Sequence, residues 1–419
     1  MEDSGHKRQA PLGRKRPGNA GFERIRPGRM ARGLEDYVMR LWASAPAKRA
    51  SYLSCVLLAA AGLATLFAAG AGGSPVPELH VSGNKLVNAR GRQVVLHGVD
   101  RSGTEFECVR GRRIFDGPDD QASVTAMKSW GVNAVRIPLN EACWNGQSYV
   151  RAVYAKYRNA VKAYVSLLNS NGIVAILDLH WTDGLFTGKW AGCLSAEAIC
   201  QKPMPDAAES VPFWSSVAAT FKGNDAVIFD LFNEPYPELA NNSNETKGWR
   251  CWRNGGSSCV GIPYPVAGMQ TLVNTVRATG ANNVIMLGGL AFSNDLTHWL
   301  AYEPKDPDHN LVASWHSYNL AACNTQSCWV SQVAPVIAKV PVIAGEIGET
   351  NCADTYIDPL TKWLNSKSTG YLAWAWDADF TCSGGPGLIT GYGGSPTSYG
   401  AGYRSILQSS ARISARAVH

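Results

Sequence analysis

Eight short apolar runs recur along the chain and alternate with stretches whose apolar positions have helical spacing. Each run is almost wholly apolar, which is typical of strands that are covered on both faces. Strands alternating with helices over short connections indicate a parallel sheet, and eight units favour a closed barrel. The predicted strands are Val94–Val99, Ala134–Pro138, Ile173–Leu179, Val227–Phe232, Val284–Leu287, Leu311–Trp315, Val342–Ala344 and Tyr371–Trp376.

The stretches between the strands predict helices, and residues 79–96 predict a hairpin. Residues 79–96 alternate and turn, which is typical of a short β-hairpin, and we expect it to close the bottom of the barrel. The predicted fold class is therefore α/β, a (β/α)8 TIM barrel with a short N-terminal β-hairpin and disulfide-stapled loops. The predicted helices are Ala122–Trp130, Arg151–Asn171, Val211–Phe221, Pro265–Thr279, Ser327–Ala338, Tyr356–Ser366 and Gly402–Ser409.

The N-terminal region has the layout of an export signal. Residues 1–50 are basic, residues 51–77 carry no charge, and Ala69-Gly70-Ala71 offers a small-x-small cleavage site. We expect residues 1–50 to be a cytoplasmic tail or the result of a mis-assigned start, with translation from Met39. Residues 51–73 are then a signal peptide or membrane anchor, and residues 74–419 are the catalytic barrel. We expect a secreted monomer, or alternatively a barrel held outside the membrane by residues 51–71.

The cysteines agree with export. Of 11 cysteines, Cys55 lies in the apolar run, and the other ten lie in loop-like stretches of the barrel. In an oxidising compartment such cysteines are expected to staple loops, although sequence alone leaves their connectivity open. The natural pairs are Cys193/Cys200, Cys251/Cys259, Cys323/Cys328, Cys108/Cys143 and Cys352/Cys382.

The formal net charge of +6 comes from the N-terminal segment. Residues 1–50 contain 12 Lys or Arg and 5 Asp or Glu, whereas the other 369 residues contain 27 and 28. The barrel is therefore close to neutral, and we expect no nucleic-acid partner.

Two carboxylates follow buried strands. Glu234, in Asn233-Glu234-Pro235, follows the fourth strand, and Glu346, in Gly345-Glu346-Ile347-Gly348, follows the seventh. Because the C-terminal ends of barrel strands converge on one mouth, the two carboxylates should face each other. Hydrolysis of a glycosidic bond generally requires two carboxyl groups that flank it. We predict Glu234 as the acid/base and Glu346 as the nucleophile, and we expect Glu349 to be a structural carboxylate.

Further polar and aromatic residues end other strands. Asn233 is suited to hold a sugar 2-hydroxyl, Arg136 to keep Glu346 ionised, and Tyr318 to donate to it. His180 and His316 are expected to bind sugar hydroxyls and orient the carboxylates. Aromatic rings stack on sugar faces, so Trp181, Trp374 and Trp376 are predicted to bind substrate, with one of the last two forming the floor where the bond breaks. Further candidate cleft aromatics, about half of them expected to be plain packing, are Trp144, Trp190 and Trp329.

Other chemistries lack their residue patterns. Asp178, His180 and Asp183 have no second cluster at ligand spacing, so we expect no metal site. No Gly-x-Ser-x-Gly follows a strand, and no Gly-x-Gly-x-x-Gly follows the first one, which argues against a serine hydrolase and a dinucleotide fold. Because carboxylates supply both proton and nucleophile, we expect no cofactor.

Residues 79–410 resemble glycoside hydrolase family 5, the cellulase-containing family of clan A barrels. The resemblance rests on Gly98-Val-Asp with Gly103-Thr-Glu105, Val135-Arg136-Ile-Pro, His180, Asn233-Glu234-Pro235, His316-x-Tyr318, Gly345-Glu346 and Trp374. It implies a retaining double displacement in which Glu346 attacks the anomeric carbon and Glu234 protonates the leaving group, with the carboxyl groups about 5–5.5 Å apart. Asp100 departs from the Asn that is frequent in the family, and Gly184–Pro205 matches no familiar subfamily pattern.

We therefore predict an exported enzyme that hydrolyses O-glycosyl bonds of a β-linked polysaccharide or oligosaccharide, an endo-β-1,4-glucanase of the cellulase type. The alternatives are a β-mannanase, a β-1,3- or β-1,6-glucanase, and a glycolipid-cleaving glycosidase. Two further hypotheses do not involve catalysis: a carbohydrate-binding barrel and a membrane-tethered scaffold.

Overall fold

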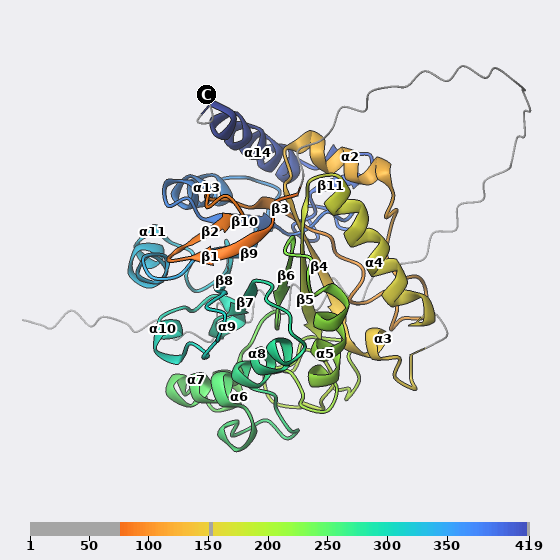
Figure 1. Ribbon diagram of the computed structural model, residues 1–419, viewed down its shortest axis with the longest axis vertical. Helices are drawn as coiled ribbons and strands as arrows, with labels where there is room; N and C mark the ends of the chain where they lie inside the picture. Colours follow the sequence, from red (N-terminus) through yellow and green to blue (C-terminus); the bar gives the residue numbers. More distant parts are fainter. Residues whose placement is uncertain (1–75, 151–153, 417–419) are drawn as a thin grey trace, which may run out of the picture.

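The computed structural model describes residues 76–150 and 154–416 and contains a closed eight-stranded parallel barrel ringed by helices (Figure 1). The predicted (β/α)8 fold is confirmed. Around the barrel the strands run in the order β10-β3-β4-β5-β6-β7-β8-β9. They are β3 (His97–Asp100), β4 (Ala134–Asn140), β5 (Val174–Trp181), β6 (Val227–Asp230), β7 (Ile285–Gly288), β8 (Leu311–Tyr318), β9 (Val342–Gly348) and β10 (Gly370–Ala373).

Four strands extend at least two residues further toward the mouth than their apolar runs predict. β4, β5, β8 and β9 continue to Asn140, Trp181, Tyr318 and Gly348, because parallel pairing persists into the polar residues of the site. The first strand was predicted too early, since Val94–Leu96 lead into β3 without belonging to it. β6 and β10, by contrast, end at Asp230 and Ala373, earlier than the predicted Phe232 and Trp376. Hydropathy alone therefore does not fix where these strands end.

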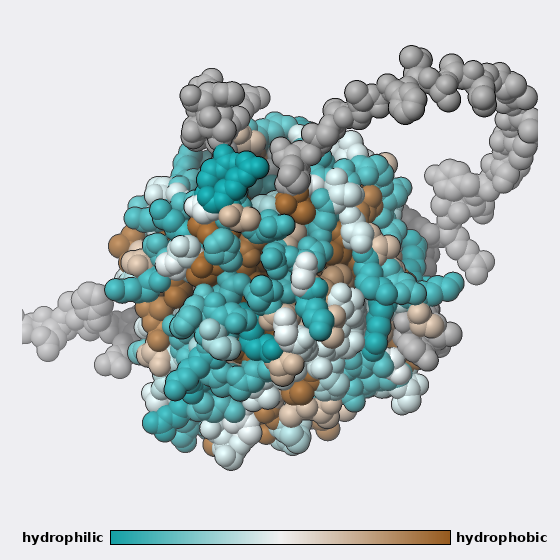
Figure 2. Space-filling model, in the orientation of Figure 1, coloured by the Kyte–Doolittle hydropathy of each residue, from teal (hydrophilic) through white to brown (hydrophobic). Residues whose placement is uncertain are grey.

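Helices cover the outside of the barrel, and the hydrophilic residues on the face in Figure 2 are interrupted by only small hydrophobic patches. All seven predicted helices are present, with shifted ends. Several short mouth-side helices were not predicted. The helices are α2 (Gln121–Trp130), α3 (Glu141–Asn145), α4 (Tyr154–Ser170), α5 (Ser210–Phe221), α6 (Pro237–Ala240), α7 (Glu245–Asn254), α8 (Met269–Ala278), α9 (Leu290–Ser293), α10 (Trp299–Tyr302), α11 (Gln326–Cys328), α12 (Ala334–Ile337), α13 (Ile357–Ser366) and α14 (Ser398–Arg416), with a π-helical turn at Trp329–Val333.

The predicted N-terminal hairpin closes the bottom of the barrel. β1 (Leu79–Ser82) pairs antiparallel with β2 (Lys85–Asn88). Leu79 and Leu86 pack into one apolar cluster with inward-facing residues at the beginnings of the barrel strands. Backbone N–H of Leu79 donates to Asp225 O at 2.9 Å, which ties the hairpin to the chain just before β6. A second hairpin, β11 (Ile389–Gly391) with β12 (Ser395–Pro396), was not predicted.

Five disulfides staple the loops, and they join the five predicted pairs: Cys108–Cys143, Cys193–Cys200, Cys251–Cys259, Cys323–Cys328 and Cys352–Cys382. The predicted signal or anchor at 51–73 and the basic segment 1–50 lie outside the described residues. Within the described part, no helix has the length and apolar character needed to cross a membrane.

Candidate active site

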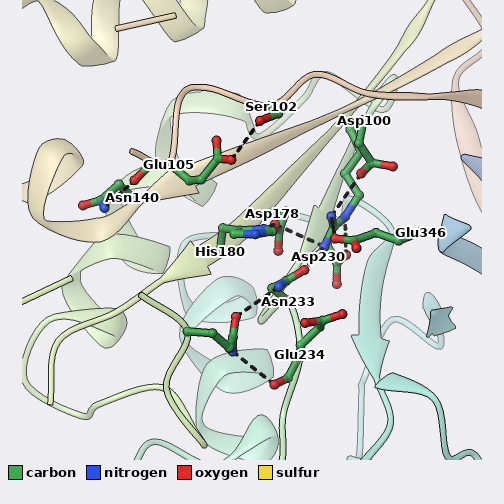
Figure 3. Close-up of polar contacts among 12 residues, drawn as sticks. Asp100, Ser102, Glu105, Asn140, Asp178, His180, Asp230, Asn233, Glu234 and Glu346 are labelled. Carbon is green, nitrogen blue, oxygen red and sulfur yellow. Dashed lines mark hydrogen bonds and ion pairs between the residues drawn. The ribbon is translucent and has the colours of Figure 1, made fainter. Parts of the chain in front are cut away.

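Glu234 and Glu346 meet at the C-terminal mouth of the barrel, as predicted (Figure 3). Glu234 follows β6, and Glu346 lies in β9. Carboxylate oxygens of the two residues and a ring nitrogen of His316 all lie within 4.8 Å of one another. Retaining glycosidases place their carboxyl groups about 5–5.5 Å apart, whereas inverting ones leave about 6.5–9.5 Å for a water molecule. Oxygen atoms of the two carboxyl groups thus approach each other more closely than the inverting range.

Irregularities in strand pairing set the side-chain directions of site residues in β5 and β9. Trp315 of β8 pairs with Ala344, and the next residue, His316, pairs with Glu346, so Gly345 is an extra residue in β9. A Cβ on Gly345 would lie 2.6 Å from Ser314 Oγ, which explains why glycine stands here. The pairing of β4 with β5 skips His180 in the same way. Such bulges re-aim side chains next to active sites.

Arg136 is the centre of the site beneath the two glutamates. Its guanidinium is fully buried and contacts four carboxylates and one amide. Nη1 lies 2.7 Å from Glu346 Oε1, so the predicted contact is present, while its effect on the ionisation of Glu346 stays a prediction. The other partners are Asp100 at 3.1 Å, Asp178 at 3.1 Å, Asp230 at 3.0 Å and Asn233 Oδ1 at 2.8 Å.

One guanidinium cannot balance four ionised carboxylates, so this cluster holds protons. Burial raises the pKa of Asp100 well above its ordinary value, against the opposing effect of Arg136. Burial likewise raises the pKa values of Asp178 and Asp230, again opposed by Arg136. Glu346 makes the shortest of the four contacts with Arg136, and the three aspartates make the others at 3.0–3.1 Å.

Both predicted histidines are in the site and are neutral. Burial lowers the pKa of His180 to about 3 and lowers that of His316 well below its ordinary value. His180 Nδ1 lies 2.6 Å from Asp178 Oδ2, and His316 Nδ1 lies 3.1 Å from Glu234 Oε1. Neutral imidazoles orient a carboxyl group or a hydroxyl without adding charge.

Tyr318 donates its phenolic hydrogen to Glu346 Oε2 at 2.6 Å, as predicted. Its ring lies against the backbone of Gly348, where a Cβ would come within 2.4 Å of the ring. The nucleophile candidate therefore has one oxygen on Arg136 and the other on Tyr318. Glu349, by contrast, accepts hydrogen bonds from Tyr356 N and Thr355 Oγ1, which confirms it as a structural carboxylate.

Replacing Tyr318 by Phe is expected to lower kcat/KM about tenfold at acidic pH and less at alkaline pH. A hydrogen bond to a charged group is worth roughly 1.5–3 kcal/mol, and its loss disfavours the ionised nucleophile. The acidic limb of the pH–rate profile should therefore move to higher pH. The matched control is Tyr356→Phe, which removes a partly buried hydroxyl that bonds Ser317 instead. An unmoved acidic limb in Tyr318→Phe, or an equal shift in the control, would contradict this role.

Of the three tryptophans predicted to bind substrate, only Trp374 borders the site. Trp374 lies beside His180, with ring centroids 5.4 Å apart and planes 19° apart, and is 8% exposed, so it borders the site. Trp376 is fully buried and packs edge-on against Trp130, so its predicted contact with substrate is wrong. Residue 376 lies beyond the end of β10, and its ring belongs to the main hydrophobic core together with Trp130. Trp181 is buried in the main core and offers little surface to a ligand.

The remaining cleft candidates divide similarly. Trp144 and Trp329 are packing residues of the main core, while Trp190 lines a pocket on the mouth side. Asn233 uses its oxygen for Arg136 and donates Nδ2 to Gln201 Oε1 at 3.0 Å. Gln201 also donates to Glu234 O, at 3.1 Å. It lies between Cys200 and Lys202, where nothing in the sequence marks it as part of the site.

Asp100, Asp178 and Asp230 were not predicted as site residues, although a signal existed. Each carries charge in or directly after an apolar run, and a charge on a buried strand must find a partner. In the barrel register Asp100 pairs with Arg136, and Asp178 pairs with Asp230. These residues on neighbouring strands therefore converge on one guanidinium.

The unfolding free energy is expected to fall as pH rises from 6.5 to 8. Burial raises the pKa of Glu105 to about 8 and that of Glu238 to about 8. A glutamate with a raised folded pKa contributes stability at low pH, and this is lost as pH rises through the folded pKa, by up to about 1.4 kcal/mol per proton and pH unit. Urea unfolding at several pH values measures the slope. Glu238→Gln should flatten it, and a variant as steep as the parent would contradict the assignment.

Glu234, His316 and Glu346 also have a spacing that could hold a cation. Their chemistry does not require one, because a neutral histidine and two carboxyl groups suffice for acid/base and nucleophilic roles. The expectation of a reaction without metal stays a prediction.

A known protein family matches most of the barrel sequence. The family model for cellulases of glycosyl hydrolase family 5 matches residues 87–380. A mannan endo-1,4-β-mannosidase of Streptomyces lividans is 23% identical over 346 residues, which cover 79% of this chain and 76% of that protein. Endoglucanase B of Clostridium cellulovorans is 28% identical over 207 residues, which cover 47% of this chain and 41% of that one.

Solved structures share the fold. A β-glucanase of Saccharophagus degradans superposes with a TM-score of 0.60 at 18% identity, covering 81% of this chain and 95% of that one. The catalytic domain of a mannanase from Streptomyces sp. SirexAA-E superposes with a TM-score of 0.53 at 21% identity, covering 79% and 88%.

Proposed function

The chain belongs to glycosyl hydrolase family 5, and from this membership we propose that it is an exported, retaining endo-β-1,4-glycanase whose substrate is a β-1,4-glucan. As a member of the family it is a glycosidase that acts on O-glycosyl bonds. The observation that carries the proposal is the spacing of Glu234 and Glu346, whose carboxylate oxygens lie within 4.8 Å.

In the proposed first step, Glu346 attacks the anomeric carbon while Glu234 gives its proton to the glycosidic oxygen. The carbon–oxygen bond breaks, and the glycone is held as an ester on Glu346. Arg136 and Tyr318 support this step because each contacts one oxygen of Glu346 and keeps it ionised and fixed in orientation.

In the proposed second step, Glu234 accepts a proton from water, and the hydroxyl oxygen attacks the same carbon. The ester bond breaks and Glu346 is released, so the product keeps the β configuration. His316 supports both steps by its contact with Glu234, since a neutral imidazole tolerates either protonation state of its partner.

The choice of glucan rests on the cellulase family model and on the relative named endoglucanase B. A β-1,4-mannan is the second candidate, favoured by the mannosidase of Streptomyces lividans, which covers more of the chain. Export is supported by the five disulfides, because such bonds persist in oxidising compartments.

The test is reducing-sugar release from carboxymethyl cellulose, mixed-linkage glucan, glucomannan, galactomannan, laminarin and a glycosylceramide, with the product anomer followed by NMR. Cleavage of glucans with β product supports the proposal. Preferential cleavage of galactomannan moves the substrate to mannan, and cleavage of the glycolipid alone would reject a polysaccharide substrate. An α product would reject the double displacement.

A further inference from the structure

The backbone holds the two glutamates of the site in different ways. Glu346 lies within β9, where the ladder with β8 pairs it with His316. β6, by contrast, ends at Asp230, and Glu234 follows on the loop beyond it. For an acid/base group a misplacement of about 1 Å can cost roughly 100-fold in rate. The acid/base role of Glu234 therefore requires groups outside the strand ladder that fix its backbone.

Two side chains hold the peptide groups on either side of the Glu234 Cα atom. Ser293 Oγ donates to Asn233 O at 2.8 Å, and Gln201 Nε2 donates to Glu234 O at 3.1 Å. The first carbonyl belongs to the peptide plane before Glu234, and the second belongs to the plane after it. Because the orientations of these two planes define φ and ψ of Glu234, they also fix the direction of its Cα–Cβ bond.

Gln201 can meet its partners in one amide orientation. Its Nε2 group donates to Glu234 O and, at 3.0 Å, to Lys202 O, while its Oε1 atom accepts from Asn233 Nδ2 at 3.0 Å. A reversed amide would turn its oxygen toward two carbonyl oxygens and its NH₂ group toward another NH₂ group. Cys200, the preceding residue, is in a disulfide, and Lys202 is buried, so the backbone of Gln201 is anchored on both sides.

Ser293 ends a left-handed turn. In α9, Ala291, Phe292 and Ser293 have φ values of 50°, 58° and 60°, a region that residues other than glycine rarely adopt. Such residues cost free energy that other contacts must offset, and strain of this kind is concentrated at functional sites. Here the turn lets Phe292 N donate to Pro235 O at 3.1 Å and places the Ser293 hydroxyl on Asn233 O.

The same turn also holds the histidine that contacts the acid/base candidate. Asn294, the residue after Ser293, donates Nδ2 to His316 O at 2.7 Å. His316 Nδ1 in turn lies 3.1 Å from Glu234 Oε1. Gly288, at the end of β7, leaves the space that the serine hydroxyl occupies, because a Cβ there would collide with Ser293 Oγ. The turn therefore fixes the backbone of Glu234 and of its partner together.

Resting on the proposed function, we propose that Gln201 and Ser293 are positioning residues for the acid/base Glu234, whose carboxyl group they aim at the leaving oxygen. Their effect passes through Glu234, so it is felt where a proton must be delivered. A leaving group that needs protonation depends on both residues, whereas dinitrophenolate leaves without a proton and depends on them little. Gln201→Met has a further loss, common to all substrates, through Asn233.

The decisive variants are Ser293→Ala and Gln201→Met, assayed in the full chain on phenyl and dinitrophenyl β-cellobiosides and β-mannobiosides. We expect the ratio of kcat/KM on the phenyl glycoside to that on the dinitrophenyl glycoside to fall about tenfold, part of the 10²–10⁴-fold effect of general acid catalysis. A loss of folded protein lowers both rates in proportion and leaves this ratio unchanged. Ser293→Gly lacks the hydroxyl but suits the positive φ, so it should keep the kinetic defect with at least the stability of Ser293→Ala.

Two matched controls remove similar bonds outside the site. Thr361→Val removes a buried hydroxyl that donates to a carbonyl of α13 at 2.8 Å, and Gln270→Met removes an amide that bonds the backbone of Lys305. Both should leave the ratio unchanged. In the Glu234→Ala background, Ser293→Ala should change kcat/KM less than about twofold, because a residue that acts through Glu234 has no carboxyl group left to position.

Crystal structures of the parent protein and the two variants give a readout without turnover, in which the Glu234 carboxyl group should move by about 1 Å or more. Movement in the variants of a parent that hydrolyses neither glycoside would reject the proposed function and leave the positioning standing. An unchanged ratio with an unmoved Glu234 in an active parent would overturn the positioning alone. An equal fall of the ratio in the controls, or an undiminished effect of Ser293→Ala in the Glu234→Ala background, would also overturn it.

Discussion

Glu346→Gln is expected to abolish hydrolysis, lowering kcat about 10⁵-fold, on the scale seen when the nucleophile of other covalent enzymes is removed. Glutamine has the same shape, and its oxygen can still accept from Arg136, so the fold should persist. It cannot form the ester intermediate. The measurement is release of dinitrophenolate from aryl β-cellobiosides and β-mannobiosides, together with reducing-sugar assays on the polymers.

Glu349→Gln is the matched control, because it changes the same residue type three positions later. Its carboxylate bonds Tyr356 N and Thr355 Oγ1, so the variant should lose some stability and keep its activity. Equal inactivation of both variants would point to misfolding. Full activity in Glu346→Gln would remove it from the nucleophile role.

Glu234→Ala separates the two carboxylates. Loss of general acid catalysis costs about 10²–10⁴-fold on polymers, whose leaving groups need a proton. A dinitrophenolate leaves without one, so the first step with the aryl substrate should remain fast and be followed by slow hydrolysis of the ester. A burst of dinitrophenolate would identify this pattern. A variant impaired equally on both substrates would contradict the acid/base assignment.

Arg136→Met is expected to lower the unfolding free energy by about 3–5 kcal/mol at neutral pH and to remove activity. Breaking a buried ion pair leaves uncompensated charge, and here Asp100, Asp178, Asp230 and Glu346 lose their common cation. The carboxyl groups respond by holding protons, and a protonated Glu346 is no nucleophile.

The sign of the pH effect makes this prediction specific. Without the cation, protons stay on the folded protein to higher pH than on the unfolded chain. Stability is then retained in acid and lost as pH rises. The unfolding free energy of the variant should therefore approach that of the parent protein near pH 5 and lie furthest below it near pH 8. Urea unfolding at each pH measures both values. Arg136→Lys keeps the positive charge but loses the planar guanidinium that donates to several partners at once. It should therefore recover only part of the stability.

Arg277→Met is the matched control for a buried arginine outside the site. Arg277 pairs with Asp306 at 2.7 Å and Asp308 at 3.1 Å. Its loss should destabilise the protein without changing kcat/KM of the folded fraction. A smaller stability loss in Arg136→Met than in this control, or retained activity, would show that the four-carboxylate cluster is not organised by Arg136.

The sequence by itself determined the architecture and the two central residues. Eight apolar runs separated by helical patterns specify a barrel because strands buried on both faces need helices around them. Glu234 and Glu346 could be identified because strand ends of a barrel converge, whatever the details of packing. Three disulfides, with cysteines 7, 8 and 5 residues apart, were suggested by short spacings in loops, whereas Cys108–Cys143 and Cys352–Cys382, 35 and 30 residues apart, are fixed by the fold.

Only the tertiary structure decided what surrounds the two glutamates. The gathering of Asp100, Asp178 and Asp230 on Arg136 depends on the register between neighbouring strands, which hydropathy does not encode. The skipped pairings at His180 and Gly345 turn the following side chains by one position, and the burial of Trp376 against Trp130 is set by packing beyond the end of β10. Gln201 and the Trp190 pocket come from a loop whose path is set by contacts with α6 and Tyr236, far from it in sequence. Local patterns specify which elements form, whereas register and loop contacts are set by long-range packing, and these decide which polar groups share the site.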